Sequence, residues 1–376
     1  MREFDVAVIG AGIAGASLAF RIAGQRSTVV LERETQPGMH ATGRSAAMFM
    51  ESYGPPGVRA LTRASRRFCE EPPQGFTPHA LLAPRGVLYL ATHEQAALLQ
   101  RMRDELAAGG TRVEAIGAAA TIARVPCLRP DVVHGALLET DARDIDVHAL
   151  HQGFLRGLRQ QGGELQMGAA PLRAERRGDA WELHFDGAEP LRAHTVVDAG
   201  GAWADPIAGL FGARPLGLEP RRRSAFTFRP PTGMDIAQWP AVVGVDESYY
   251  FKPDAGQLLG SPANADPTVA HDVMPEELDV AMGIHQIESV TTLTIRRPTH
   301  IWAGLRTFAP DGEIVIGFDG ACPGFFWLAG QGGYGIQSAA GASELAAALL
   351  LGIPLSPELT RHGVDPAAVS PLRLRR

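Results

Sequence analysis

A glycine-rich hexamer close to the start of the chain constrains the fold more than any other feature. Residues 10–15 read Gly-Ala-Gly-Ile-Ala-Gly, a GxGxxG pattern, and they follow an apolar stretch at residues 4–9 that predicts a buried strand. A helix is predicted over residues 16–23, and a second apolar strand over residues 28–31. This order of strand, glycine turn, helix and strand predicts a βαβ unit that opens a parallel sheet.

Each glycine of the hexamer has a separate task in such a unit. Gly10 permits the tight turn, Gly12 lets backbone amides approach a pyrophosphate, and Gly15 lets the helix pack closely on the strand. The helix N-terminus offers unpaired N–H groups to the phosphates. Glu32, which closes the second strand, is expected to accept hydrogen bonds from the adenosine ribose, and a carboxylate there disfavours a 2′-phosphate. The unit is therefore predicted to bind FAD or NAD rather than NADP.

A second glycine-rich turn, near the other end of the chain, favours FAD over NAD. Residues 330–335 read Gly-Gln-Gly-Gly-Tyr-Gly, between a predicted strand at 325–328 and a predicted helix at 336–351. This arrangement directs a second helix N-terminus at an anion, and reduced flavin carries negative charge along its N1–C2=O edge. An NAD-dependent dehydrogenase remains the alternative, which the yellow colour of a bound flavin would exclude.

Length and composition set the number of domains and exclude several classes of protein. A chain of 376 residues is longer than one core usually supports, and 45% apolar with 20% charged residues is typical of globular proteins. A net charge of −6 gives no general attraction for nucleic acid or anionic lipid. Three widely spaced cysteines exclude a disulfide framework and a CxxC metal motif, so no metal site is expected. We expect no signal peptide, no membrane span and a cytoplasmic location.

Between the two glycine turns the sequence pattern changes character. Residues 85–91 predict a strand, and residues 223–295 alternate as strands of an antiparallel sheet, with Pro253–Gly256 as a hairpin turn, a helix at 275–287 and a further strand at 291–296. Before this region, Asp146 is expected to cap a helix that runs to about residue 161. We therefore predict an α/β fold joined to an α+β fold. A discontinuous Rossmann-like FAD domain would comprise residues 1–80, 145–221 and 305–376, and an inserted mixed or antiparallel substrate-binding domain residues 81–144 and 222–304.

Several longer motifs together resemble one superfamily of flavoproteins. They are Leu31–Glu34, His40–Ala47, Gly200–Trp203, Tyr250–Gly256, Gly260–Asp266, Thr294–Pro298, Gly304–Arg306, Pro310–Gly312 and Ile316-Gly317. From end to end the chain resembles the D-amino-acid oxidase and glycine oxidase superfamily, and most closely the bacterial FAD-dependent D-arginine dehydrogenases. The resemblance implies a non-covalent FAD, since Met48 cannot form a histidyl link and Cys322 lies just before a buried strand. It also implies an amino-acid substrate and an unidentified electron acceptor, which could be a quinone, a carrier or oxygen.

The resemblance assigns the cofactor residues in three groups. Ala14, Glu32 and Arg33 would meet the adenosine end, with the backbone of Leu172 beside the adenine. Residues 41–48 would lie along the pyrophosphate and the flavin ring, and residues 332–337 around the pyrimidine edge. The complete expected set is Gly10, Gly12, Ala14, Gly15, Glu32, Arg33, Ala41, Thr42, Gly43, Arg44, Ser45, Ala46, Ala47, Met48, Leu172, Gly332, Gly333, Tyr334, Gly335, Ile336 and Gln337.

Oxidation of an amino acid by flavin requires a clamp on the substrate carboxylate, a neutral amine and a Cα–H directed at flavin N5. A guanidinium suits the first task because its donors match a carboxylate in pairs. Arg306 matches the carboxylate-binding position of the superfamily. Arg223 matches a second carboxylate arginine of the D-arginine dehydrogenases, with Arg222 as the alternative if the register differs.

Two tyrosines and one glycine complete the expected catalytic set. Tyr53 and Tyr250 match the tyrosines that lie over the carboxylate and along the substrate in that family. Tyr249 could be the inward residue instead of Tyr250, because neighbours on a strand face opposite sides. The carbonyl group of Gly333 is expected to accept a hydrogen bond from the substrate amine.

The side-chain pocket departs from that of the D-arginine dehydrogenases. Where those enzymes carry a histidine, a threonine and a guanidinium-binding glutamate, this chain has Met48, Met50 and Val87, although either methionine could simply fill space in the core. A cationic side chain is costly to bury without an acid partner, and Glu51 is the nearest acid that could supply one. We therefore predict oxidative deamination of D-amino acids to 2-oxo acids and ammonia, with apolar side chains preferred.

Two other functions remain open at the level of sequence. The first is oxidation of a 2-hydroxy acid or a secondary amine by the same fold; a hydroxy acid needs a base, and His148 and His151 lie on a helix of the expected nucleotide domain. The second is flavin binding without turnover, against which the presence of Arg306 and Tyr250 speaks.

Overall fold

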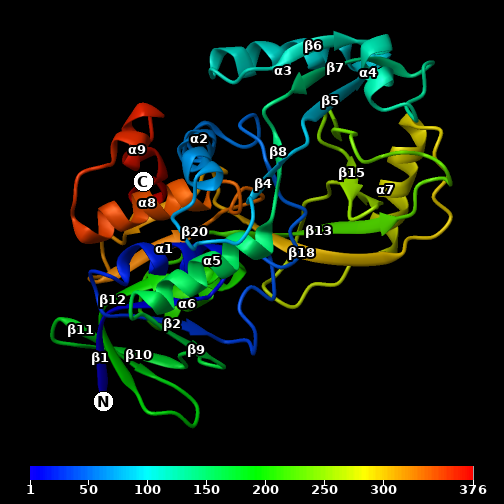
Figure 1. Ribbon diagram of the computed structural model, residues 1–376. Helices are drawn as coiled ribbons and strands as arrows, with labels where there is room; N and C mark the ends of the chain where they lie inside the picture. Colours follow the sequence, from blue (N-terminus) through cyan, green and yellow to red (C-terminus); the bar gives the residue numbers. More distant parts are fainter. Residues whose placement is uncertain (376) are drawn as a thin grey trace.

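The structure, a computed structural model that describes residues 1–375, consists of two lobes, each built on one large sheet (Figure 1). The sheet of the first lobe has eight strands and that of the second has nine. A small sheet between the lobes is formed by β3 (Met48–Phe49), β8 (Arg143–Ile145) and β4 (Leu82–Pro84). The predicted fold class, a Rossmann-like domain with an inserted mixed-sheet domain, is confirmed.

The first sheet is mainly parallel and opens with the predicted βαβ unit. Its strands are β1 (Arg2–Ile9), β2 (Thr28–Glu32), β9 (Glu164–Met167), β10 (Arg173–Arg177), β11 (Ala180–His184), β12 (Leu191–Asp198), β19 (Val315–Phe318) and β20 (Phe325–Ala329). β1 lies in parallel between β2 and β12, and β20 pairs in parallel with the second half of β12. The carboxyl ends of β1, β12 and β20 therefore meet at one edge, where open α/β sheets bind their ligands.

Helices cover both faces of this sheet because its central strands are apolar on both sides. They are α1 (Ile13–Ile22), α2 (Pro56–Glu70), α5 (Val147–Gln160), η2 (Gly201–Trp203), α6 (Ala204–Leu210), α8 (Ala339–Leu351), α9 (Pro357–Arg361), α10 (Pro366–Val369) and η3 (Pro371–Arg375). Val6 and Val8 pack toward α1 and α8, whereas Ala7 and Ile9 pack with residues of α6 on the opposite face. Asp146 caps α5 as predicted, since its carboxylate accepts the Ala149 amide.

The second sheet carries helices on both faces: Leu99 packs with Val87 and Tyr89, whereas Val280 packs with Leu88 and Leu90 on the opposite face. Its elements are β5 (Val87–Thr92), η1 (His93–Gln95), α3 (Ala96–Ala108), β6 (Glu114–Gly117), α4 (Ala118–Arg124), β7 (Val133–Glu139), β13 (Glu219–Phe228), β14 (Ala241–Gly244), β15 (Tyr250–Asp254), β16 (Gln257–Ser261), β17 (Asp266–Pro267), α7 (Glu277–Val290) and β18 (His300–Phe308). The predicted hairpin after Tyr250 is present, and Ala255 and Gly256 both adopt positive φ, as a type I′ turn requires.

Two long antiparallel strands, β13 and β18, join the second sheet to the first lobe (Figure 1). The boundaries expected at residues 222 and 305 fall inside these strands, because each pairs along nearly its whole length within the nine-stranded sheet. Residues 292–296, expected as a strand, are irregular, since only Thr291 forms a bridge, to Leu128. Within residues 1–375 no helix combines the length and apolar character needed to cross a membrane.

Candidate active site

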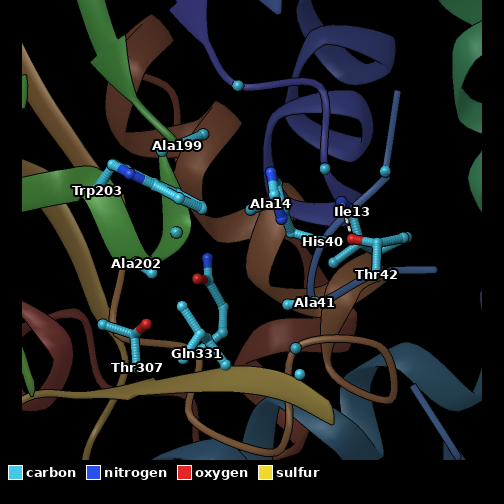
Figure 2. A pocket seen from close by; sticks show the side chains of 18 of the residues that line it. Ile13, Ala14, His40, Ala41, Thr42, Ala199, Ala202, Trp203, Thr307 and Gln331 are labelled. Atoms are coloured by element: carbon cyan, nitrogen blue, oxygen red, sulfur yellow. Dashed lines mark hydrogen bonds between the residues drawn. The ribbon is translucent and has the colours of Figure 1, made fainter. Parts of the chain in front are cut away.

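A cavity of about 420 Å³ lies where the two lobes meet. Segments from distant parts of the chain line it: both glycine-rich turns, the loop at 38–46, the turn at 199–203, and residues of β13, β15 and β18. Figure 2 shows the indole of Trp203 and the amide of Gln331 reaching toward the same space from different segments. The cavity is therefore assembled by tertiary contacts between the predicted nucleotide and substrate regions.

The first glycine turn is packed as its predicted tasks require. Gly10 has a φ of 103°, and a Cβ there would lie 2.5 Å from the Ala199 carbonyl oxygen. A Cβ on Gly15 would lie 1.9 Å from the Gly10 carbonyl oxygen, so α1 can sit this close to the turn only with glycine. Gly12 lines the cavity, whereas Gly15 lies behind it.

Two buried polar side chains fix the turn from outside. The Ile13 amide donates to Thr42 Oγ1 at 3.0 Å (Figure 2), which satisfies one of the free N–H groups at the start of α1. His151 Nε2 donates to the Ala11 carbonyl at 2.8 Å, and burial lowers the pKa of this imidazole. His151 therefore supports the turn as a neutral side chain and does not face the substrate end.

Of the residues expected to meet adenosine, Ala14, Glu32 and Arg33 line the cavity and Leu172 does not. Glu32 lines the cavity while its carboxylate accepts the amides of Ala11 at 2.8 Å and Glu34 at 3.0 Å. Residues 169–171 line the cavity, but Leu172 does not: its side chain is exposed and its amide donates to the His184 carbonyl. That pairing holds Leu172 away from the cavity.

Trp203 forms part of the cavity wall, although its motif did not predict it as a site residue. Its ring carries the Arg33 guanidinium at 4.2 Å and lies 4.7 Å from the His40 ring, and all three residues line the cavity. His40 is also 2.9 Å from the Glu34 carboxylate. The indole therefore has one face committed to Arg33, a cation–π contact that holds both side chains at the cavity wall.

Arg44 ties the loop expected along the flavin to the second lobe. Its guanidinium donates to the carbonyls of Val273 at 3.1 Å and Ala303 at 3.2 Å, and it pairs with Asp272. The Trp302 indole in turn donates to the Arg44 carbonyl at 3.1 Å. The expected residues that line the cavity here are Ala41, Thr42, Arg44, Ser45 and Ala46, whereas Gly43, Ala47 and Met48 do not.

The second glycine turn brings Arg306 and Tyr53 together. Arg306 Nη1 donates to Tyr53 Oη at 3.1 Å, and a Cβ on Gly333 would lie 2.7 Å from the same nitrogen. The Gly332 amide donates to the Thr307 carbonyl at 2.8 Å, which fastens the turn to β18. Tyr53 does not itself line the cavity but stands behind Arg306, packed against Tyr334 with ring centroids 4.8 Å apart.

The strand register settles the two alternatives that alternation left open. Arg223 and Tyr250 line the cavity. Arg222 points the other way and pairs with Asp279 at 2.9 Å, and Tyr249 is buried in the core on the outer side of the sheet. Burial and the neighbouring charge of Arg306 lower the pKa of Arg223 to about 10, so both guanidinium groups are cationic at neutral pH.

The expected side-chain pocket is not part of the cavity. Met50 and Val87 are buried in a cluster with Tyr89 and Leu137, and Met48 packs against that cluster. Tyr53 packs against the same cluster and contacts Arg306, and none of the three lines the cavity. This corrects the prediction that Met48, Met50 and Val87 form an open pocket: they form the core behind Tyr53.

Among the expected residues of the second turn, Gly332, Gly333, Gly335 and Ile336 line the cavity, while Tyr334 and Gln337 do not. Gln337 is buried, and its Nε2 donates to the carbonyls of Met50 at 3.1 Å and Tyr53 at 3.2 Å. Gln337 therefore holds the loop that carries Tyr53 rather than the cofactor.

Three acids lie near this end of the molecule, and two are committed to other groups. Glu51, the expected compensating acid, pairs with Arg66 at 2.6 Å. Glu139 is buried and accepts hydrogen bonds from the loop at 51–52. Glu247, in the turn between β14 and β15, has a φ of 54°; desolvation raises the pKa of its carboxyl, and the charges of Arg223 and Arg306 oppose that rise. Neither Glu139 nor Glu247 was expected, and neither lies in a recognisable motif.

Comparison with known proteins identifies the family. The DAO family model, described as FAD dependent oxidoreductase, matches residues 5–349. The chain belongs to this family. A curated relative of this DAO-family protein, hydrogen cyanide synthase subunit HcnC of Pseudomonas aeruginosa, is 23% identical over 98% of this chain and 99% of its own.

Solved structures similar to this DAO-family protein share its fold along nearly the whole chain. Glycine oxidase from Geobacillus kaustophilus has a TM-score of 0.84 at 21% identity, covering 97% of this chain and 99% of its own. L-proline dehydrogenase from P. horikoshii has a TM-score of 0.83 at 19% identity, covering 100% and 98%. At these identities the likeness shows the fold.

The cofactor is FAD, and the cavity suits such a dinucleotide. Glycines line it at positions 10, 12, 38, 200, 201, 304, 332, 333 and 335. A Cβ added at Gly201 would meet no atom within 4 Å, so the open space beside this backbone is available to a ligand. Residues of the first turn would hold the diphosphate, and those near Arg306 the end that supplies hydride-accepting chemistry.

We expect the FAD of this DAO-family protein to be bound without a covalent link. Cys322 is buried with its thiol directed at the Phe211 carbonyl, and burial raises the pKa of this thiol to about 11, so it has no thiolate at neutral pH. Acid precipitation should release all of the flavin into the supernatant. Yellow colour that stays with the washed protein pellet would contradict this prediction.

Proposed function

We propose that the protein oxidises D-amino acids to 2-oxo acids and ammonia, by hydride transfer from Cα to flavin N5. The observation that carries the proposal is a pair of guanidinium groups, Arg223 and Arg306, that line one cavity; within residues 1–375 neither forms a salt bridge. The charge of Glu247 acts on both groups but forms no ion pair with either, so these neighbouring cations are unfavourable unless a further anion joins them. A substrate carboxylate meets that need, since each guanidinium can donate to it in pairs.

The proposed role of each residue follows from the position of its side chain or carbonyl group. Arg306 and Arg223 would hold the carboxylate, Tyr53 would orient Arg306, and Tyr250 would lie along the substrate. The carbonyl of Gly333 would accept from the amine and so orient it in its neutral form. As hydride leaves Cα, the amine loses a proton to solvent and becomes an imine, which water hydrolyses to the 2-oxo acid and ammonia. The D configuration is supported by the resemblance to the D-arginine dehydrogenases.

The position of the histidines favours an amino acid over a 2-hydroxy acid. Oxidation of a hydroxy acid needs a base for the hydroxyl proton. His151 is occupied by the Ala11 carbonyl, and the histidine that lines the cavity, His40, sits beside Trp203 and Glu34. Anaerobic bleaching of the flavin by a panel of D- and L-amino acids, secondary amines and 2-hydroxy acids tests the proposal. Bleaching by 2-hydroxy acids alone would overturn it.

We further expect D-Leu, D-Met or D-Phe to be better substrates than D-Arg or D-Lys. Each Å² of apolar side chain that is buried gains about 25 cal/mol, whereas a guanidinium must shed water and find a counter-charge. Glu51 and Glu139 cannot supply that charge, because Arg66 and the loop at 51–52 hold them. The prediction is an advantage in kcat/KM on the order of tenfold or more for D-Leu over D-Arg.

The predicted preference is tested by measuring kcat/KM for D-Leu and for D-Arg with the same electron acceptor. The matched variant is Glu247→Gln, because Glu247 is the remaining acid near the arginine pair. If D-Arg proves the better substrate and the variant loses that preference, Glu247 supplies the counter-charge and the expected apolar preference is wrong.

A further inference from the structure

A buried acid faces the core behind the proposed substrate clamp. Glu139 ends β7 and is 2% exposed; in the sheet it stands directly opposite Val87 on β5. Residues opposite each other on antiparallel strands share one face of the sheet, so Glu139 lies on the same face as Val87 and Tyr89. The chain thus places a carboxylate in an otherwise apolar cluster, and such a group needs a specific set of partners.

The partners of Glu139 belong to the loop that carries Tyr53. Its carboxylate accepts the Glu51 amide at 2.7 Å and the Ser52 hydroxyl. Ser52 Oγ is in turn 2.6 Å from the Tyr89 hydroxyl. If Tyr89 donates to Ser52 and Ser52 to Glu139, the ionised carboxylate receives a donor on each oxygen and every group of the chain is satisfied.

The same loop is held from the other lobe by Gln337, which donates to the carbonyls of Met50 and Tyr53. Two buried side chains, one from each lobe, therefore fix the residues on either side of Ser52. The loop then presents Tyr53 Oη to Arg306 Nη1 at 3.1 Å.

We propose that Glu139 is a positioning residue for the substrate clamp, which it maintains by anchoring the loop that places Tyr53 against Arg306. The link to substrate rests on the proposed function, whereas the anchoring of the loop does not. Protonation of Glu139 would weaken the anchor, because the acid must then donate to Ser52. Ser52 then accepts from Glu139, and the proton of either Ser52 or Tyr89 is left without a partner in this chain of hydrogen bonds.

The burial of Glu139 brings this protonation close to neutral pH. Burial raises the pKa of the Glu139 carboxyl to about 7, and the charge of Glu51 adds to the rise. The other titratable and charged groups packed around it are Tyr89 on β5, on which Glu247 also acts, and Arg66 of α2, which pairs with Glu51. Because the folded pKa lies above that of a free glutamate, the wild type should lose stability as pH rises from 5 to 7.

Hydrogen exchange of the holoenzyme tests the anchor without any substrate. The variant Glu139→Gln resembles the protonated acid, and Glu114→Gln is the control, since Glu114 is exposed on the adjacent strand β6. At pH 8 the amides of residues 48–54 should exchange about threefold faster or more in Glu139→Gln than in the wild type or the control. At pH 6 this difference should shrink. Unchanged exchange at pH 8 would overturn the proposal.

Benzoate, a carboxylate without an amine, serves as the ligand in a second measurement that follows the flavin spectrum. Its Kd at pH 8 should rise about three- to tenfold in Glu139→Gln and approach the wild-type value at pH 6. The Tm of the variant should nevertheless exceed that of the wild type at pH 8, which a merely structural role would not produce. If Glu139→Gln exchanges faster but neither the wild type nor any variant binds benzoate, the role of Glu139 in anchoring the loop is supported and the proposed carboxylate clamp is refuted.

Ser52→Ala is a second test of the loop anchor, which remains usable if Glu139→Gln does not fold. It removes the hydroxyl between Tyr89 and Glu139 but keeps the hydrogen bond from the Glu51 amide to the Glu139 carboxylate. It should also speed amide exchange of residues 48–54 at pH 8. If both Ser52→Ala and Glu139→Gln retain FAD and match the wild type, Glu139 does not position the loop.

Discussion

Replacing Arg306 with Ala is expected to lower kcat/KM for an amino-acid substrate on the order of 10²-fold or more, without changing FAD content. Charge-assisted hydrogen bonds to a carboxylate are worth about 1.5–3 kcal/mol each, and the variant loses both donors of a paired contact. Arg223 alone would remain to hold the substrate. Steady-state kinetics with the best D-amino acid, together with the flavin-to-protein absorbance ratio, provides the measurement.

Arg222→Ala is the matched control for this experiment. Arg222 is the strand neighbour of Arg223, but it faces the outer side of the sheet and pairs with Asp279 and Glu276. Its removal should leave kcat/KM within about threefold of the wild type. The carboxylate clamp is assigned wrongly if Arg306→Ala also stays within threefold while it retains full FAD.

Gly15→Ala is expected to cause the largest loss of cofactor. The new Cβ would lie 1.9 Å from the Gly10 carbonyl oxygen and 3.0 Å from a methyl group of Val8, and a backbone carbonyl in a tight turn cannot move aside alone. Forcing α1 outward costs about 3 kcal/mol or more and displaces the amides that would meet the diphosphate. Most of the purified protein should lack flavin, and its Tm should fall by several degrees or more.

The control is Gly209→Ala on α6, where an added Cβ would meet no atom within 4 Å. This variant tests whether alanine in a helix of the same lobe is harmless by itself. Full flavin occupancy in Gly15→Ala, at a Tm equal to that of the control, would contradict the close packing of α1 on the turn.

Local patterns in the sequence were sufficient to predict the nucleotide half of the molecule. The GxGxxG turn, the apolar strands on either side and the acid at Glu32 all lie within one βαβ unit, so their geometry follows from short-range rules of strand, turn and helix. Asp146 as a helix cap and the turn at Ala255-Gly256 follow for the same reason. Arg306 came from a longer resemblance, and the structure brings it to the cavity through the pairing of β18 with the second glycine turn.

The substrate half depends on contacts between residues far apart in the chain. In this half the sequence left the inward-facing tyrosine undecided and gave a wrong prediction of the side-chain pocket. Alternation showed that one of Tyr249 and Tyr250 faces inward, but only the pairing of β15 in the sheet decides which. Met48, Met50 and Val87 have the composition of an apolar pocket, yet they form a core with Tyr53, whose loop is held by Gln337 and Glu139. Propensity and periodicity act over a few residues, whereas the exposure of a side chain is decided by which distant groups take its hydrogen bonds and cover its surface.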